Sequence, residues 1–271
     1  MSSTSNKKIF IISNETNESN NIKASFEKKL SDAGFETSDV PKTADLIVCI
    51  GGDGTLLRLM QTYQFPTVPV AGIHTGHLGF FQDVTTDGID DLIKCFKNGD
   101  YTIQPYNIAK AVIQHDGKET VIRALNEFAI TSPARHSIRL SLSINNSFIE
   151  NFYGDGILVA TPAGSTGYNY SLGGCIVDPR LNVFQVTPMA PMNTVAYRSL
   201  TSSILLPQSD KLIITPDRNS DKSTLLSVYY DGVNNIFENV ESITFTLSKR
   251  RINLLRTSDS TFWNVVKDKF L

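Results

Sequence analysis

The sequence predicts an α/β N-terminal domain at residues 1–100, followed by a mainly β domain at residues 101–251. Three observations support this division. Short apolar runs alternate with helical periodicity up to about Gly99, and strand patterns bounded by turn residues follow from about Tyr101. The 271 residues suffice for two domains, and 41% hydrophobic with 19% charged residues is a globular composition.

The first domain is predicted to contain a parallel sheet with helices between its strands. Strands are expected at residues 9–12, 46–50 and 68–71, and the first two are apolar throughout, as in strands buried on both faces. Helices are expected around residues 22–30, with a stop at Gly34, and around 55–61 and 89–96. This order predicts right-handed crossovers between parallel strands.

The second domain is predicted to be built from short strands joined by turns such as Asp116-Gly117 and Asn145-Asn146. The expected strands are residues 108–114, 121–130, 138–144, 148–152, 157–160, 203–206, 212–215, 225–230 and 243–247. The last segment, residues 252–271, ends in an apolar set of helical character. It is expected to pack back onto the first domain.

Charge and cysteine usage exclude several classes of function. The formal net charge is −2 and the one basic run is Lys249-Arg250-Arg251, so neither a nucleic-acid nor a membrane partner is expected. The three cysteines are widely spaced among apolar neighbours and are expected to be free, buried thiols. The sequence contains no apolar segment long enough for a signal core or a membrane span, which favours the cytoplasm.

A glycine-rich loop follows the second predicted strand, where α/β sheets place their ligands. Gly51, Gly52, Gly54 and Thr55 are predicted to bind phosphate through the backbone and the positive end of the following helix. No lysine of a Walker A loop is present, and no G-x-G-x-x-G occurs. Asp53 would repel a triphosphate unless a cation screens it or it accepts a proton, and both roles indicate a kinase. The alternative is that Asp53 merely caps the helix.

A second polar segment occupies residues 154–171. A strand at residues 157–160 ends there in a glycine- and hydroxyl-rich turn that can hydrogen-bond a nucleotide, and Tyr168 offers a flat face to a base. The alternative is a hairpin with ordinary turn residues.

Both segments resemble those of known kinases. The loop Gly51–Thr55 resembles one shared by NAD kinases, diacylglycerol and sphingosine kinases and 6-phosphofructokinases, whereas Asn126-Glu127 and residues 154–171 resemble the NAD kinase family. With residues 74–80, the resemblance spans about residues 45–235. It implies the two-domain fold of NAD kinases and diacylglycerol kinases. It also implies transfer of the terminal phosphate of ATP to the 2'-hydroxyl of the adenosine ribose of NAD, which forms NADP.

The resemblance also implies a role for each site residue. Asp53 would accept the proton of the ribose hydroxyl, and Mg²⁺ or another divalent cation would be carried mainly by the phosphates, with Glu127 as the protein ligand considered. Asp155 would bind the nicotinamide end, Asn126 and Glu127 the adenosine side. The remaining substrate contacts would be Gly54, Phe80, Thr166, Gly167, Tyr168, Ser171, Ala190 and Asp231. Phe80 is equally well interpreted as a core aromatic, and Asp231-Gly232 as a hairpin turn.

Two positions depart from the family pattern. Tyr153 stands where NAD kinases commonly carry Arg or Lys, and Gly167 where Ala is usual. The alternatives left open are a lipid kinase of the diacylglycerol type, a non-catalytic dinucleotide sensor, and polyphosphate in place of ATP. His74 and His77 lack the neighbours of a zinc site. The resemblance further implies a homodimer or homotetramer.

Overall fold

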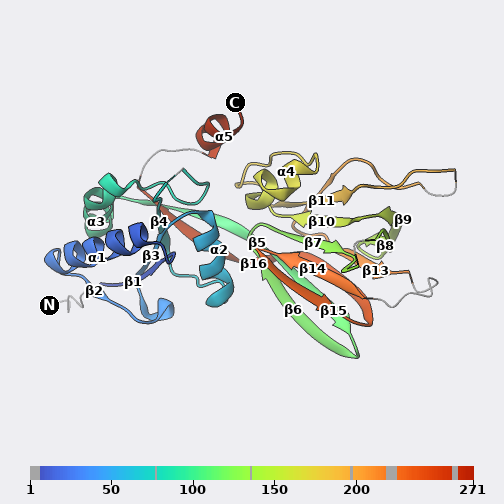
Figure 1. The fold of residues 1–271 in the computed structure, drawn as a ribbon, viewed down its shortest axis with the longest axis horizontal. Coiled ribbons are helices and arrows are strands. Elements are labelled where there is room, and N and C mark those ends of the chain that lie inside the picture. The colour runs from blue at the N-terminus through green and yellow to red at the C-terminus, as the bar shows by residue number, and fades with distance from the viewer. Residues whose placement is uncertain (1–6, 77, 135, 196–197, 218–224, 258–261) are drawn as a thin grey trace. The chain divides into compact units, whose positions relative to one another are not determined.

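The structure is a computed structural model that describes residues 7–76, 78–134, 136–195, 198–217, 225–257 and 262–271. The chain divides into two compact units, residues 1–106 with 251–271 and residues 107–250 (Figure 1). The first unit contains the α/β elements and the second unit is mainly β. Two long strands, β5 (Thr102–His115) and β16 (Val240–Arg256), belong in part to each unit.

The first unit is built on a parallel sheet, as predicted. Its strands are β1 (Lys8–Ser13), β2 (Glu36–Thr37), β3 (Leu46–Ile50) and β4 (Val70–Ile73), in the order β2-β1-β3-β4. Leu46 is paired with Ile9, and Ile47 with Val70. The residues of β3 are all buried, as the apolar run predicts. This strand lies between β1 and β4 in the sheet and ends at the glycine loop.

The helices of the first unit are α1 (Asn17–Asp32), α2 (Asp53–Thr62), α3 (Ile89–Asn98) and α5 (Phe262–Phe270), with short 3-10 turns η1 (Pro41–Thr43) and η2 (Thr86–Gly88). Thr16 caps the N-terminus of α1, because its side chain accepts a hydrogen bond from the N–H of Ser19. Gly34 follows its end with φ +85°. The helical end predicted for the last segment is confirmed by α5, whereas residues 252–256 still belong to β16.

The second unit consists mainly of antiparallel strands. They are β6 (Lys118–Ala124), β7 (Glu127–Thr131), β8 (Ile138–Ile144), β9 (Ser147–Gly154), β10 (Gly156–Ala160), β11 (Val183–Met189), β12 (Ile204–Pro207), β13 (Leu212–Pro216), β14 (Leu226–Tyr230) and β15 (Val233–Phe237). One sheet has the order β12-β11-β10-β7-β14-β15. The core of the second unit contains the fully buried rings of Phe128, Phe152, Phe184 and Phe245. A 3-10 turn η3 (Ala163–Thr166) and a short helix α4 (Tyr168–Ser171) follow β10.

The strand predicted at residues 121–130 is wrong, because the chain changes partners in its middle. Ala124 still pairs with Ala109 on β5, whereas Glu127 pairs with Ala160 on β10. The break places the half-buried Asn126 just before β7 and the half-buried Glu127 at its first position. No pattern in the sequence indicated β11.

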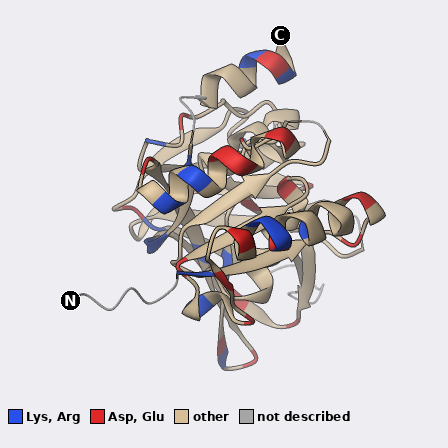
Figure 2. Ribbon diagram, turned by 90° about the vertical axis from the view of Figure 1, so that its left-hand side faces the viewer, with Lys and Arg blue, Asp and Glu red and all other residues tan. Residues whose placement is uncertain are grey.

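The surface and the thiols agree only in part with the sequence. Lys and Arg are interspersed with Asp and Glu on the helices of the first unit (Figure 2). One such pair is Lys29 and Asp90, whose side chains lie 2.6 Å apart. All three cysteines are free, but Cys175 is exposed and Cys95 half-buried, so the expected burial holds only for Cys49. Within the described residues, no helix has the length and apolar character needed to cross a bilayer.

Candidate functional site

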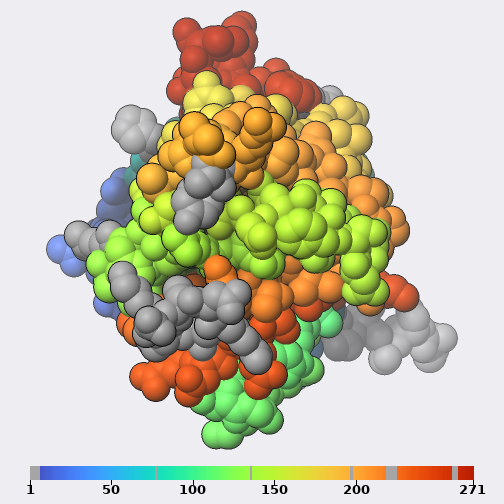
Figure 3. Space-filling view, turned by 90° about the vertical axis from the view of Figure 1, so that its right-hand side faces the viewer, coloured from blue at the N-terminus to red at the C-terminus, as the bar shows by residue number. Residues whose placement is uncertain are grey.

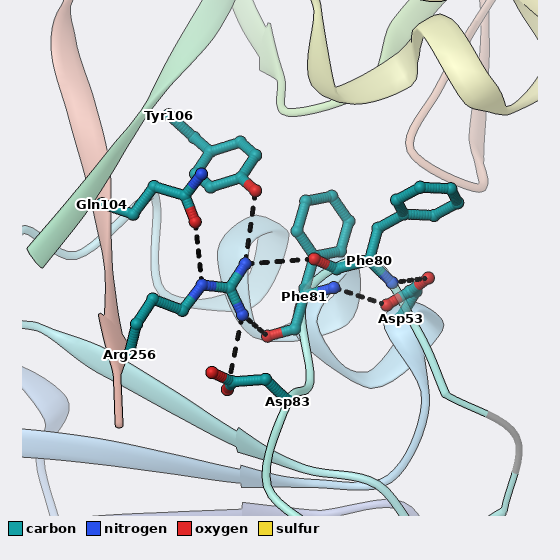
Figure 4. Close-up of polar contacts among 7 residues, drawn as sticks. All are labelled: Asp53, Phe80, Phe81, Asp83, Gln104, Tyr106 and Arg256. Carbon is teal, nitrogen blue, oxygen red and sulfur yellow. Dashed lines mark hydrogen bonds and ion pairs between the residues drawn. The ribbon is translucent and has the colours of Figure 1, made fainter. Parts of the chain in front are cut away.

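Asp53 is the first residue of α2, and its carboxylate is held by the backbone of another loop. The N–H of Phe80 donates to Oδ2 and the N–H of Phe81 donates to Oδ1, both at 3.1 Å (Figure 4). The helix cap is Gly52, with no side-chain cap bond, so the capping alternative does not describe this carboxylate. Each carboxylate oxygen has capacity for a further donor.

The glycines around Asp53 divide into two kinds. Gly51 has φ +143°, and a Cβ there would lie 3.2 Å from the Cβ of the buried Thr55, so the fold itself requires glycine. A Cβ on Gly79 would lie 2.9 Å from Cγ of Asp53. By contrast, Gly52 and Gly54 are exposed, and no described residue beyond their chain neighbours and the backbone of their own helix lies within 4 Å of a Cβ built on either. The described part of the chain therefore does not require glycine at these two positions, which leaves room for an external group.

The loop that binds Asp53 is held in turn by Arg256, from the end of β16. Its Nη2 donates to the carbonyl of Phe80 at 3.1 Å, and its Nη1 donates to that of Phe81 at 3.3 Å (Figure 4). Its Nε donates to Gln104 Oε1 at 2.8 Å. No local pattern in the sequence indicates this cluster, because Arg256 lies 175 positions after Phe81.

Two further residues contact the Arg256 guanidinium. Its Nη2 donates to the Tyr106 hydroxyl at 3.3 Å, and Nη1 lies 3.4 Å from Oδ1 of Asp83. The side chain of Asp83 is 6% exposed, and this burial raises the pKa of its carboxyl although the Arg256 charge opposes the shift. The cluster is therefore a buried ion pair inside a set of directed hydrogen bonds.

The ring of Phe80 lies against the C-terminal helix α5. Its centroid is 5.6 Å from that of Phe262 and 6.5 Å from that of Phe270, and Nζ of Lys269 is 5.3 Å from it. These contacts support the interpretation of Phe80 as a core aromatic. His77 lies outside the described residues, and the part of the chain that the structure describes contains no cluster of three or more metal-ligating side chains of His, Cys, Asp or Glu.

In the second unit, Asp231 holds the turn that carries Asn126 and Glu127. Its Oδ2 accepts from the N–H of Leu125 at 2.7 Å, and its Oδ1 accepts from that of Asn126 at 2.8 Å. Asp231 and Gly232 also form the hairpin turn between β14 and β15, with φ +44° and +84°. The hairpin interpretation of this pair is therefore confirmed, and the carboxylate has a structural partner.

Glu127 is half-buried and its Oε2 has no hydrogen-bond partner, which also holds for Oδ1 of Asn126. Burial, and secondarily the charge of Asp231, raises the pKa of Glu127 to about 8. Two unpaired oxygens side by side in sequence are free to receive a donor or a hard cation from a ligand. A Cβ on Gly167 would lie 3.5 Å from Oε2 of Glu127, so the alanine usual in NAD kinases would fit here.

In the hydroxyl-rich segment after β10, some side chains are buried and hydrogen-bonded within the unit, whereas others are exposed. Ser165 and Asn169 are buried and bonded within the unit: Ser165 Oγ donates to the carbonyl of Pro162 at 2.7 Å, and Thr187 Oγ1 donates to Asn169 Oδ1 at 2.7 Å. Thr166 is half-buried, and the other predicted contacts are exposed, namely Gly167, Tyr168 and Ser171. The buried side chains thus fix the turn that presents the exposed ones.

Asp155 and Tyr168 line a cavity of about 440 Å³. Its other lining residues, which the sequence did not indicate, are Ala129, Thr131, Ser132, Pro133, His136, Met189 and Tyr229. They come together because Thr131 pairs with Gly156, next to Asp155, at the far end of β7 from Glu127. Ala190 lies just beyond β11 with φ +43° and does not line this cavity.

Tyr153, at the position where the family carries a basic residue, has a cation beside it. The guanidinium of Arg139, its partner across β8 and β9, lies 5.1 Å from the ring centroid. A positive charge therefore accompanies the aromatic ring at this place.

Family models and similar proteins give a consistent result. A model of the ATP-NAD kinase N-terminal domain matches residues 5–101, and one of the ATP-NAD kinase C-terminal domain matches residues 125–257. The NAD kinase of Finegoldia magna is 40% identical over 247 residues, which cover 90% of each chain. The NAD kinase of Streptococcus gordonii is 36% identical over 269 residues, which cover 98% of this chain and 96% of that one.

Two solved structures share the fold. The yeast NADH kinase complexed with NADH matches with a TM-score of 0.85 and 17% identity, over 97% of this chain and 87% of the other. An NAD kinase from Archaeoglobus fulgidus in complex with ATP matches with a TM-score of 0.76 and 24% identity, over 96% and 97%. At these identities the likeness establishes the two-domain fold.

Proposed function

The chain belongs to the ATP-NAD kinase family and is an NAD kinase by that relationship, and we propose that Asp53 is the general base of its phosphoryl transfer. The observation that carries the proposal is the pair of bonds from the Phe80 and Phe81 N–H groups to the Asp53 carboxylate. These bonds fix the carboxylate beside two exposed glycines at a helix N-terminus.

The proposed reaction transfers the terminal phosphoryl group of ATP to NAD. The 2'-oxygen of the adenosine ribose forms a bond to the terminal phosphorus, and the bond from that phosphorus to the bridging oxygen breaks. ADP leaves with the electron pair, and the hydroxyl proton passes to an oxygen of Asp53. Since the transition state of phosphoryl transfer is loose, orientation of Asp53 matters more than high basicity.

The phosphates are proposed to lie at the N-terminus of α2. Gly52 and Gly54 leave their backbone open there, and the helix end attracts anions. Gly51 and Thr55 form the buried side of the loop, because Thr55 is buried against Gly51. This arrangement would orient a terminal phosphate without any lysine.

The dinucleotide is proposed to bind the second unit along β7 and β10. Asn126 and Glu127 at one end would bind the adenosine side with their unpaired oxygens, and Asp155 in the 440 Å³ cavity would bind the nicotinamide end. The half-buried Thr166 and the exposed Gly167, Tyr168 and Ser171 would add contacts from the turn that Ser165 and Asn169 hold in place. Gly54, Phe80, Ala190 and Asp231 remain the other proposed contacts.

The residues present fit a divalent cation carried mainly by the phosphates. Glu127 Oε2 and Asn126 Oδ1 are unpartnered oxygens, of the kind that Mg²⁺ prefers. When bound, such a cation would neutralise charge on the phosphates. The raised pKa of Glu127 means that its carboxyl would have to lose a proton before acting as a ligand.

The test is an assay for NADP with purified protein, NAD, ATP and magnesium. Asp53→Asn is expected to abolish NADP formation and leave NAD binding largely intact. Asp91→Asn is the matched control, because Asp91 also lies in the first turn of a helix of this unit but is exposed on α3. Near-normal turnover by the Asp53 variant would rule out the base assignment. If the natural chain bound NAD without forming NADP, the sensor alternative would be favoured.

We further propose a homodimer or homotetramer. The strand β9, yellow-green in Figure 3, carries Phe148 at 61% and Ile149 at 42% exposure. Both residues line a second cavity, of about 410 Å³, together with Arg139, Tyr153 and Arg198. An apolar strand at a sheet edge is a surface that another subunit commonly covers. A cytoplasmic location remains a prediction.

A further inference from the structure

The Arg256 cluster is a set of buried polar contacts among the described residues that the proposed mechanism does not use. Arg256 donates to Gln104, to Tyr106 and to the carbonyls of Phe80 and Phe81, and it is paired with Asp83. Its side chain is 11% exposed. A stable fold alone rarely requires a guanidinium at such a place, because desolvation of an ion pair offsets much of its attraction.

The geometry of the cluster leads directly to Asp53. The Arg256 guanidinium binds the carbonyl oxygens of residues 80 and 81, while the N–H groups of the same two residues bind the Asp53 carboxylate (Figure 4). A planar guanidinium with several fixed donors can hold two consecutive carbonyls in one orientation, whereas an ammonium group cannot. Rotation of either residue's backbone would move the N–H groups away from the carboxylate.

We propose that Arg256 is a positioning residue for catalysis, which orients Asp53 through the backbone of Phe80 and Phe81. This inference rests on the proposed role of Asp53 as the base. Arg256 touches neither substrate in this scheme. Its loss should therefore reduce kcat and leave the affinity for NAD nearly unchanged.

The kinetic experiment compares Arg256→Lys and Arg256→Gln with the unsubstituted chain. Lys keeps the charge beside Asp83 and so protects folding, but it loses the paired donors. We expect kcat to fall roughly 10- to 100-fold in both variants, as for a small displacement of a catalytic group, with KM for NAD within about twofold. Arg250→Gln is the matched control, because Arg250 is an exposed arginine on the same strand, and its kinetics should be unchanged.

A spectroscopic readout distinguishes positioning from general support of the fold. The chain contains 15 phenylalanines, so protein labelled with ¹⁵N at phenylalanine alone gives a small set of amide signals. Asp53→Asn should move the signals of Phe80 and Phe81 and thereby identify them. Arg256→Lys should move the same two signals, while those of core residues such as Phe128 and Phe245 stay in place.

The outcomes are distinct. Unchanged kcat in the folded Lys variant, with an inactive Asp53→Asn, would overturn the inference and leave the proposed base intact. Amide shifts spread over the core, or a kcat that falls only in proportion to the folded fraction, would also overturn it. An active Asp53→Asn would instead contradict the proposed function itself, while the two amide signals would still report whether Arg256 orients the loop.

Discussion

Asp53 and Asp231 are two aspartates with nearly the same hydrogen bonding and different surroundings. Each carboxylate accepts bonds from two successive backbone N–H groups, those of Phe80 and Phe81 for Asp53 and those of Leu125 and Asn126 for Asp231. Asp231 is 7% exposed, whereas Asp53 is half-buried beside exposed glycines. Paired backbone bonds therefore orient a carboxylate, and the space on its other side decides whether it can act on a ligand.

The largest expected effect separates the two aspartates by activity. Asp53→Asn should lower kcat roughly 1000-fold, the range of a lost general base, because an amide cannot accept the proton. Its midpoint of thermal unfolding should change little, since Asp53 is half-buried and water can solvate a displaced N–H group. Steady-state kinetics together with thermal unfolding of the same preparation check both statements.

The second prediction concerns Glu127, whose pKa is raised by burial and by the charge of Asp231. Glu127 has its pKa raised from 4.5 to about 8, so the native state binds a proton that the unfolded state has released. The stabilisation is complete below pH 4.5 and is lost as the pH rises through about 8. The free energy of unfolding should fall by about 5 kcal/mol across this range, at about 1.4 kcal/mol for each pH unit between the two pKa values, measured by urea titration at a series of pH values.

The control for this pH dependence is Glu127→Gln, which mimics the protonated form and cannot titrate. Its free energy of unfolding should lack this decrease. Asp231→Asn should reduce the decrease, because Asp231 contributes to the raised pKa of Glu127. A natural chain whose stability rises over this pH range would contradict the assignment.

Asp231→Asn should also destabilise the fold. The amide places an NH₂ group against one of the two buried N–H donors, which costs about 2 kcal/mol. Asp116→Asn is a close control, because Asp116-Gly117 is also a hairpin turn with positive φ, yet Asp116 is exposed. Equal losses of stability in the two variants would show that turn geometry, and not the buried bonds, is responsible.

The smallest expected effect tests the glycines near Asp53. Gly51→Ala should lower the free energy of unfolding by about 1 kcal/mol or more, because φ there is +143° and the new Cβ meets Thr55. Gly54→Ala should leave stability unchanged or slightly higher. If Gly54 is open for a phosphate, its variant should raise KM for ATP, and an unchanged KM would argue against a ligand there.

The sequence predicted features that depend on neighbours along the chain. The apolar run of β3, the helix stop at Gly34 and the hairpin at Asp231-Gly232 all follow from local patterns. The strand expected at residues 121–130 failed, because the exchange of partners after Ala124 depends on β5 and β10, which lie elsewhere in the sequence.

The site shows the same limit. The resemblance indicated Asp53 and Asp155, but the N–H groups of Phe80 and Phe81 carry no side-chain pattern. His136 and Tyr229 reach the cavity only through strand register. Likewise, Ser165 resembles Thr166 in type and differs from it in burial, which sequence spacing alone does not reveal.

The position of Arg256 in the chain has a consequence for protein synthesis. The glycine loop and residues 80 and 81 leave the ribosome early, but the arginine that holds their carbonyls follows Phe81 by 175 positions. The strand segment beside β4 also arrives then, since Leu254 pairs with Val70. A nascent chain interrupted before this point would carry every residue of the glycine loop and still lack the arginine that holds the carbonyls of residues 80 and 81. Incomplete translation products should therefore lack the orientation of Asp53 on which efficient phosphoryl transfer depends.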